Sequence, residues 1–210
     1  QANQGDATAE SLVRILTPLL KFRACRDNVP VATGAMEVRG GNGYVEDWVN
    51  ARLIRDAQVG LLWEGTSNIN ALDVITRAIA KVRAHYTLAG TLQDKIDDAP
   101  DIPGQFQGLL SAQVERAFAF ADEVAGDPAQ EDKARMATNA LYHAASAVLL
   151  AWEGATVGAA GGDARRLLLS RMVVDNRLLP QDPLAAGENR FAKAAATLLL
   201  QDDPVPLAPG

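Results

Sequence analysis

The chain has 210 residues, of which 48% are hydrophobic and only 5% aromatic. This length is enough for one domain, or two small ones, with a buried core. The formal charge of −6 excludes a generally basic surface of the kind that attracts nucleic acid phosphates. Because small and aliphatic side chains dominate, we predict an all-α fold, an antiparallel helical bundle.

Cysteine and histidine are scarce in this chain. Cys25 is the only cysteine, so no intramolecular disulfide is expected, and a reducing, cytoplasmic location is predicted. With one cysteine and two histidines, a metal site is not expected. No apolar run approaches the roughly 18–20 residues of a membrane span. Because Gln1 comes first and residues 8–25 already have helical spacing, we expect the C-terminal part of a longer protein.

A helix is predicted over residues 8–38, with a kink at Pro18 and a kink or short break at Pro30. The glycines of residues 40–43 end it. A loop is expected over residues 44–50. A short helix over residues 51–58 follows, in which Arg52 and Asp56 are spaced for an i,i+4 ion pair.

A long helix is predicted after residue 66. Thr66 or Ser67 is expected to cap its N-terminus. One apolar stripe of this helix is formed by Ile69, Leu72, Ile75, Ile79 and Val82. Asp73, Arg77 and Lys81 lie on another face at i,i+4 spacing.

Residues 89–104 are acidic and rich in turn formers, and they are interpreted as a linker between residues 1–88 and an additional helical region, 105–201. Residues 202–210 are expected to form a mobile tail. Asp163 is expected to cap the third helix of the additional region, which ends before Pro180. The helices predicted in this region cover residues 105–125, 130–157, 163–179 and 188–200.

Glu64 is the first candidate for chemistry, in the run Trp63-Glu64-Gly65. An acidic residue near a helix N-terminus is most often structural, because the helix dipole favours it there. The neighbouring apolar residues allow a second interpretation. A carboxylate held against an apolar surface has a raised pKa and can act as a general base.

The run Gly40-Gly41-Asn42-Gly43-Tyr44 is the second candidate. Such glycines most often mark a turn that needs positive φ. The functional alternative is that the missing Cβ atoms let the backbone approach a dinucleotide phosphate. The run is not the GxGxxG fingerprint and no strand precedes it, so a Rossmann site is not implied.

Taken together, the segment AMEVRGGNGYVEDWVNARLIRDAQVGLLWEGTSNI resembles the C-terminal helical domain of the acyl-CoA dehydrogenase family. That family carries a Gln-x-x-Gly-Gly-x-Gly-aromatic turn, an Arg-x-x-Arg-Asp helix start and an aromatic-Glu-Gly-Thr loop at similar spacing. The resemblance covers about residues 30–80. It implies FAD as cofactor, an acyl-CoA thioester as substrate and a homotetrameric parent protein.

The resemblance also implies individual roles. Glu64 corresponds to the base that removes the α-proton of the thioester, and Trp63 and Gly65 would border the acyl chain. The FAD contacts implied are Thr66, Ser67 and Asn68 in one loop, and Glu37, Gly40 and Gly41 in a turn facing a neighbouring subunit's FAD. Glu37 stands where many members have glutamine, and a carboxylate would be repelled by a diphosphate.

The tryptophan at position 63, Glu37 and the run Leu72-Asp73-Val74 resemble the AidB-like branch, as does the helical extension. AidB-like proteins are flavoproteins linked to the alkylation-damage response. Two hypotheses follow. Either the parent is an acyl-CoA dehydrogenase of which this portion alone is inactive, or the chain is a non-enzymatic module of assembly or DNA-damage response. The acidic composition makes nucleic acid binding by this portion unexpected.

Overall fold

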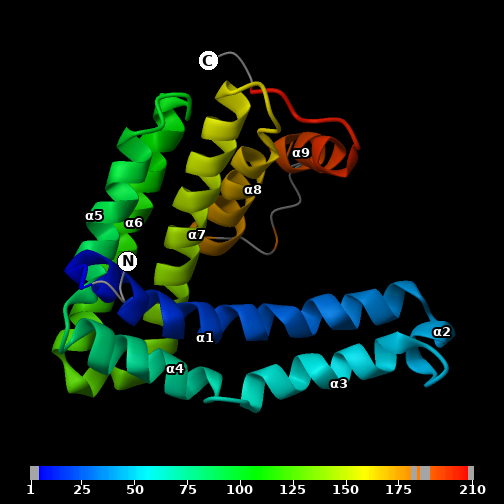
Figure 1. Ribbon diagram of the computed structural model, residues 1–210, viewed down its shortest axis with the longest axis horizontal. Coiled ribbons are helices and arrows are strands. Elements are labelled where there is room, and N and C mark those ends of the chain that lie inside the picture. The colour runs from blue at the N-terminus through cyan, green and yellow to red at the C-terminus, as the bar shows by residue number, and fades with distance from the viewer. Residues whose placement is uncertain (1–4, 181–183, 185–189, 208–210) are drawn as a thin grey trace. The chain divides into compact units, whose positions relative to one another are not determined.

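The computed structural model describes residues 5–180, 184 and 190–207. Every regular element within these ranges is a helix, and no strand occurs there (Figure 1). The all-α prediction is therefore confirmed. No helix in the described part of the chain is long and apolar enough to cross a membrane.

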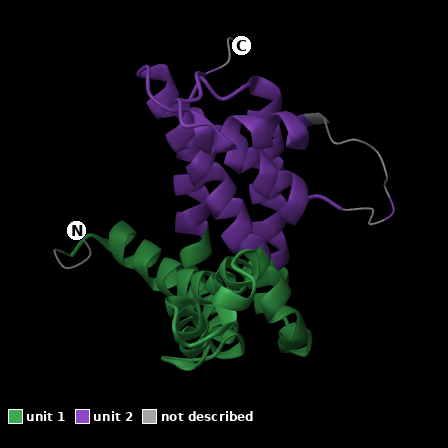
Figure 2. Ribbon diagram, turned by 90° about the vertical axis from the view of Figure 1, so that its right-hand side faces the viewer, with its two compact units in different colours: residues 1–85, 121–139 green, residues 86–120, 140–210 purple. Residues whose placement is uncertain are grey.

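The chain divides into two compact units (Figure 2). Unit 1 contains residues 1–85 and 121–139, and unit 2 contains residues 86–120 and 140–210. Two long helices, α6 (Gly104–Gly126) and α7 (Ala134–Ala159), each supply residues to both units.

Unit 1 is built on α1 (Ala7–Val38), which begins at an N-cap, Asp6. The Asp6 carboxylate accepts from the backbone N–H of Thr8 at 2.9 Å. The helix continues through Pro18 and Pro30, so the break predicted at Pro30 does not occur. The φ angle of proline is compatible with a helix, and packing of α1 against α3 and α4 offsets the missing backbone bonds.

A helical hairpin follows, in which α3 (Val49–Leu62) lies alongside α1 (Figure 1). The short helix α2 (Gly41–Tyr44) joins them, where a turn and a loop were predicted. Helix α3 is longer than the predicted 51–58, because the backbone becomes extended only at Trp63. The predicted ion pair is confirmed, with Arg52 Nε 3.6 Å from Asp56 Oδ2.

Helix α4 (Ser67–Asp73) continues without interruption into the π-helical segment η2 (Val74–Ile79). The predicted apolar stripe is only partly correct. Ile75 and Ile79 are buried, whereas Ile69 and Val82 are 59% and 51% exposed. The wider π turn rotates the buried face after Asp73, so a stripe at α-helical spacing cannot stay on one side.

Residues 89–104 are not the unstructured linker that was predicted. Helix α5 (Ala84–Asp97) covers residues up to Asp97, and only the segment up to α6 is irregular. The buried side chains Leu88, Leu92 and Ile96 recur every four residues. The acidic residues lie on the opposite, exposed face, which explains why composition alone indicated a linker.

The remaining predicted helices are confirmed with shifted ends. Helix α6 matches the predicted 105–125 and α7 follows a 3₁₀ segment, η3 (Pro128–Lys133). Helix α8 (Arg165–Val173) runs into a second π segment, η4 (Val174–Leu178). The N-cap of α8 is Ala164, one residue after the predicted Asp163, but Asp163 Oδ1 accepts from the backbone N–H of Arg165 at 2.9 Å. Helix α9 (Arg190–Leu200) is the last, and residues 188 and 189 lie outside the described residues.

The segment after α9 was predicted to be a mobile tail, but residues 202–207 are held in place in unit 2. Val205 is 5% exposed, and its carbonyl accepts from the Ala164 N–H at 2.8 Å. Its own N–H donates to Asp163 Oδ1 at 3.0 Å. Asp163 therefore stabilises both the start of α8 and the C-terminal segment. Residues 208–210 lie outside the described residues.

Candidate functional site

Glu64 occupies a two-residue turn between α3 and α4. Helix α3 closes with the Trp63 N–H donating to the Val59 carbonyl at 3.0 Å. Glu64 then has φ +54° and Gly65 has φ +99°. The left-handed region disfavours a residue with a Cβ by about 1–2 kcal/mol. The chain thus places its candidate base at a position where glycine is the ordinary choice.

Asn70 holds this turn in place, and its role was not predicted. Its side-chain Nδ2 donates to the carbonyl oxygens of Gly65 at 2.9 Å and Thr66 at 3.0 Å. Thr66 is the N-cap of α4, but its hydroxyl makes no capping hydrogen bond, so the side-chain cap predicted here is absent. The sequence spacing does not indicate this role of Asn70, because an asparagine early in a helix is common and need not hold a turn.

The turn is open to solvent in this chain. Glu64 is exposed, Trp63 is 67% exposed and Leu62 is 69% exposed. The expectation that neighbouring apolar residues confine the Glu64 carboxylate is therefore wrong for the chain by itself. Leu62 and Trp63 thus add exposed apolar surface beside the Glu64 turn.

The glycine turn lies at the other end of α3. Gly40 has φ +56°, and its N–H donates to the Glu37 carbonyl at 3.0 Å. A Cβ on Gly43 would lie 2.3 Å from the Met36 carbonyl oxygen, so only glycine fits there. Gly41 is different, because a Cβ there would meet nothing within 4 Å and its φ is not positive. Contacts within the chain do not explain why position 41 is glycine.

The structure does not bring the two candidate segments together within one chain. They flank α3, whose 14 residues span about 21 Å at the rise of an α-helix. Glu37, Gly40 and Gly41 lie near the beginning of α3, and all three are exposed. Glu64 and residues 66–68 lie just after its end.

The loop 66–68 contacts two features of unit 1. The Ser67 hydroxyl accepts from Arg26 Nη1 at 3.0 Å. Asn68 and Leu72 line a shallow depression of about 360 Å³, together with residues of η3 and α7. The depression carries both signs of charge, from Arg135 and two acidic residues, so it is no dedicated anion site.

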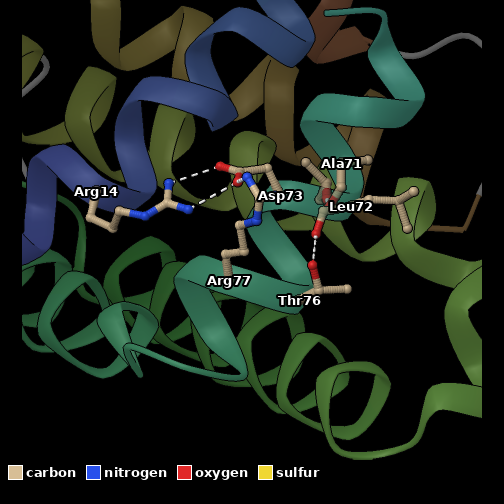
Figure 3. A network of polar contacts seen from close by, with 7 residues as sticks. Arg14, Ala71, Leu72, Asp73, Thr76 and Arg77 are labelled. Atoms are coloured by element: carbon tan, nitrogen blue, oxygen red, sulfur yellow. Dashed lines mark hydrogen bonds and ion pairs between the residues drawn. The ribbon is translucent and has the colours of Figure 1, made fainter.

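An ion-pair network fixes the other end of α4 (Figure 3). Arg14 of α1 donates to both carboxylate oxygens of Asp73, at 2.8 and 3.0 Å. Arg77 adds a bond to Asp73 at 3.2 Å. The hydrogen bond from Arg14 lowers the pKa of Asp73, and partial burial opposes this shift without reversing it. The same pairing raises the pKa of Arg14.

The fold and these loops define a helical module with two exposed turns of unusual backbone conformation. Residues 2–80 match the sequence profile of the acyl-CoA dehydrogenase C-terminal domain. The match confirms, for this segment alone, the resemblance found in its motifs. The match ends where η2 ends, so α5 to α9 lie outside it.

Curated relatives agree over the same part of the chain. Acyl-CoA dehydrogenase family member 11 of Caenorhabditis elegans is 40% identical over 75 residues, which are 36% of this chain and 12% of the relative. AidB of Escherichia coli, assigned by name to the acyl-CoA dehydrogenases, is 40% identical over 85 residues, 40% of this chain and 16% of AidB.

A third relative is 3-methylmercaptopropionyl-CoA dehydrogenase of Ruegeria pomeroyi, which is 33% identical over 75 residues, 36% of this chain and 13% of that protein. The chain thus spans well under a fifth of the length of the relatives it matches. No solved structure gives a significant match to it.

Proposed function

We propose that this chain is the C-terminal portion of an FAD-dependent acyl-CoA dehydrogenase that desaturates an acyl-CoA thioester between its α and β carbons. The observation that carries the proposal is Glu64, held at φ +54° within the motif where the family has its base. Backbone strain of this kind clusters at functional sites, where surrounding contacts maintain it. Here Asn70 supplies those contacts.

In the proposed reaction, the Glu64 carboxylate removes the α-proton of the thioester. When bound, FAD accepts the hydride that leaves the β carbon. The α-proton becomes acidic enough only if hydrogen-bond donors polarise the thioester carbonyl. Trp63 and Gly65, on either side of Glu64, would border the acyl chain, and the exposed indole of Trp63 provides an apolar wall.

Two observations support the proposed cofactor contacts. Gly41 leaves open space where a side chain would stand, so a ligand can approach its backbone. Ser67 and Asn68 present a hydroxyl and an amide beside the Glu64 turn. Glu37 fits less well, since its exposed carboxylate would repel a diphosphate. We therefore assign the backbone of Gly40 and Gly41, more than the Glu37 side chain, to that contact.

The separation of the two segments along α3 favours an assembly in which they serve different active sites. We propose a homotetrameric parent protein in which the Gly40–Gly41 turn faces the FAD of a neighbouring subunit. The isolated chain would then be inactive, because its Glu64 is exposed and nothing encloses a substrate around it. A cytoplasmic location is proposed, as the single cysteine indicates.

The test uses the full-length protein with acyl-CoA thioesters of varied chain length. Bleaching of the visible flavin absorbance is expected in the wild type and a loss of at least about 100-fold in its rate for Glu64→Gln. Glu46→Gln is the matched control, because Glu46 is an exposed glutamate of the same unit whose ion pair, among the described residues, is with Arg55. Equal bleaching by wild type and Glu64→Gln would exclude Glu64 as the base.

The second candidate function is an AidB-like flavoprotein without significant turnover, acting in assembly or in the DNA-damage response. The 40% identity to AidB favours this candidate. The net charge of −6 opposes direct DNA binding by this portion. This second candidate would gain support if no thioester bleached the flavin while the protein bound duplex DNA with a steep salt dependence.

A further inference from the structure

We infer that Arg26 is a positioning residue that holds the loop 66–68 in place through Ser67. Arg26 is one of two arginines by which α1 holds α4. The inference rests on the proposed function only in that the loop contacts FAD. The contact itself is a feature of the fold: Arg26 Nη1 donates to Ser67 Oγ at 3.0 Å across 41 residues of sequence.

Arg26 differs from the other two arginines of α1. Arg14 pairs with Asp73, and Arg23 pairs with Asp27 one helical turn away. Among the described residues, no carboxylate forms an ion pair with the half-buried Arg26. Its contact across the helix pair is to a neutral hydroxyl. Arg26 thus differs from Arg14 and Arg23 in its acceptor, and its side-chain contact joins α1 to the start of α4.

Arg14 and Arg26 reach the two ends of α4. The last residue of α4, Asp73, bonds to Arg14, and its first residue, Ser67, bonds to Arg26. Figure 3 shows the contact at Asp73. The order is reversed along α1, as expected for helices that run antiparallel. One arginine thus holds the last residue of α4 and the other holds its first.

The contact at the beginning of α4 acts on the candidate site. Ser67 lies between Thr66 and Asn68, so holding its side chain restricts both neighbours. The planar guanidinium has a fixed donor geometry, and it gives the loop a defined position before any ligand binds. Asn70, in α4, donates to the carbonyls of Gly65 and Thr66, and Arg26 donates to Ser67 from α1.

The test compares Arg26→Gln with Arg14→Gln in the full-length protein. First, amide hydrogen exchange is measured without added FAD. Arg26→Gln is expected to speed exchange at Asn70 and Ala71, the first bonded amides of α4, by about tenfold. Arg14→Gln is expected to speed exchange beyond Asp73 and to lower the melting temperature more.

Second, FAD affinity is measured by titrating the flavin-free protein and following flavin fluorescence. Arg26→Gln is expected to bind FAD about tenfold more weakly. Arg14→Gln is expected to retain its FAD affinity within about twofold, because its contact with Asp73 lies at the opposite end of α4 from Ser67. Ser67→Ala should weaken binding at least as much as Arg26→Gln, because it removes both the contact with Arg26 and the hydroxyl that the proposed function places against FAD. The double variant should bind no more weakly than Ser67→Ala alone.

The outcomes separate the inference from the function it builds on. If the wild type binds FAD and Arg26→Gln changes neither affinity nor exchange at residues 70–71, the inference is wrong and the proposed function stands. If the wild type binds no FAD, the proposed function fails, and the exchange data alone decide whether Arg26 positions the loop. Should Arg26→Gln fail to fold, exchange at residues 70–71 is measured in flavin-free Ser67→Ala, where the loss of a contact with FAD has no effect, and unchanged exchange would overturn the inference.

Discussion

The three glycines of residues 40–43 stand in three different environments. Gly40 has φ +56°, which a side chain would strain. Gly43 is buried against the carbonyl of Met36, with no room for a Cβ. Gly41 has neither a positive φ nor a close neighbour. Two of these glycines are therefore needed to fold the turn, whereas the fold does not require the third, and the proposed FAD contact would explain it.

Alanine substitutions at positions 43 and 41 should therefore have opposite effects. Gly43→Ala is expected to lower the free energy of unfolding by about 1–3 kcal/mol, because the new Cβ overlaps the α1 backbone. Gly41→Ala is expected to raise it by about 0.4–1 kcal/mol, because glycine loses more backbone entropy on folding. Urea denaturation of both variants measures the difference.

Gly41→Ala should also weaken FAD binding in the full-length protein, even though it does not destabilise the fold. A Gly41→Ala protein that is more stable and binds FAD normally would contradict the assignment of this glycine to the cofactor. A Gly41→Ala protein that is strongly destabilised would mean that the turn itself requires glycine there.

At this scale the sequence identifies residues but not their partners. Glu64 stands out by its motif, yet its left-handed backbone becomes evident only when α3 is seen to end at Leu62. Arg26 cannot be linked to Ser67 from spacing, since 41 residues separate them. The role of Asn70 is equally hidden in the sequence, because its hydrogen bonds depend on the conformation of the turn. Long-range and conformation-dependent contacts are what pattern reading misses.

At the scale of elements, composition misled where periodicity would have been a better guide. The acidic residues of 89–104 indicated a linker, but Leu88, Leu92 and Ile96 repeat at helical spacing. Helices α6 and α7 were predictable because they are long, rich in alanine and leucine, and bounded by turn formers. Helix α1 was predictable from the apolar spacing of its first half. The π segments η2 and η4 were not, because no simple periodic pattern marks a change of helix type.

Helix α5 can be tested directly as a core element. Leu92 is 1% exposed, so Leu92→Ala is expected to lower the free energy of unfolding by about 2–5 kcal/mol. Asp94, two residues away and exposed, is the matched control, and Asp94→Ala should change it by less than about 0.5 kcal/mol. Equal, small effects of both substitutions in thermal or urea denaturation would restore the linker interpretation.

At the scale of the whole molecule, exposed apolar side chains are concentrated in residues 2–80, the segment that matches the family profile and is called the family domain below. Val38, Tyr44 and Trp63 are 90%, 75% and 67% exposed, and Trp48 is 52% exposed. Aromatic side chains in such positions are typical of interface anchors. The second half of α1 contributes no buried residue to the core of its own unit. The hairpin of α1 and α3 thus leaves much of its apolar surface exposed within the chain.

The proposed homotetramer explains this surface, and two substitutions at the α2 end of the hairpin test it. Tyr44→Ser with Trp48→Ser removes two exposed aromatic side chains, and serine at position 48 is a favourable N-cap for α3, so the fold should be preserved. If these residues anchor contacts between copies, sedimentation should show the assembly shifted toward monomer, with association weakened about 30-fold or more. Leu200→Ser is the matched control, because Leu200 is 86% exposed but lies in α9, outside the family domain. An unchanged assembly in the double variant would place the contacts between copies elsewhere, and the apolar end of the hairpin would then need a different partner.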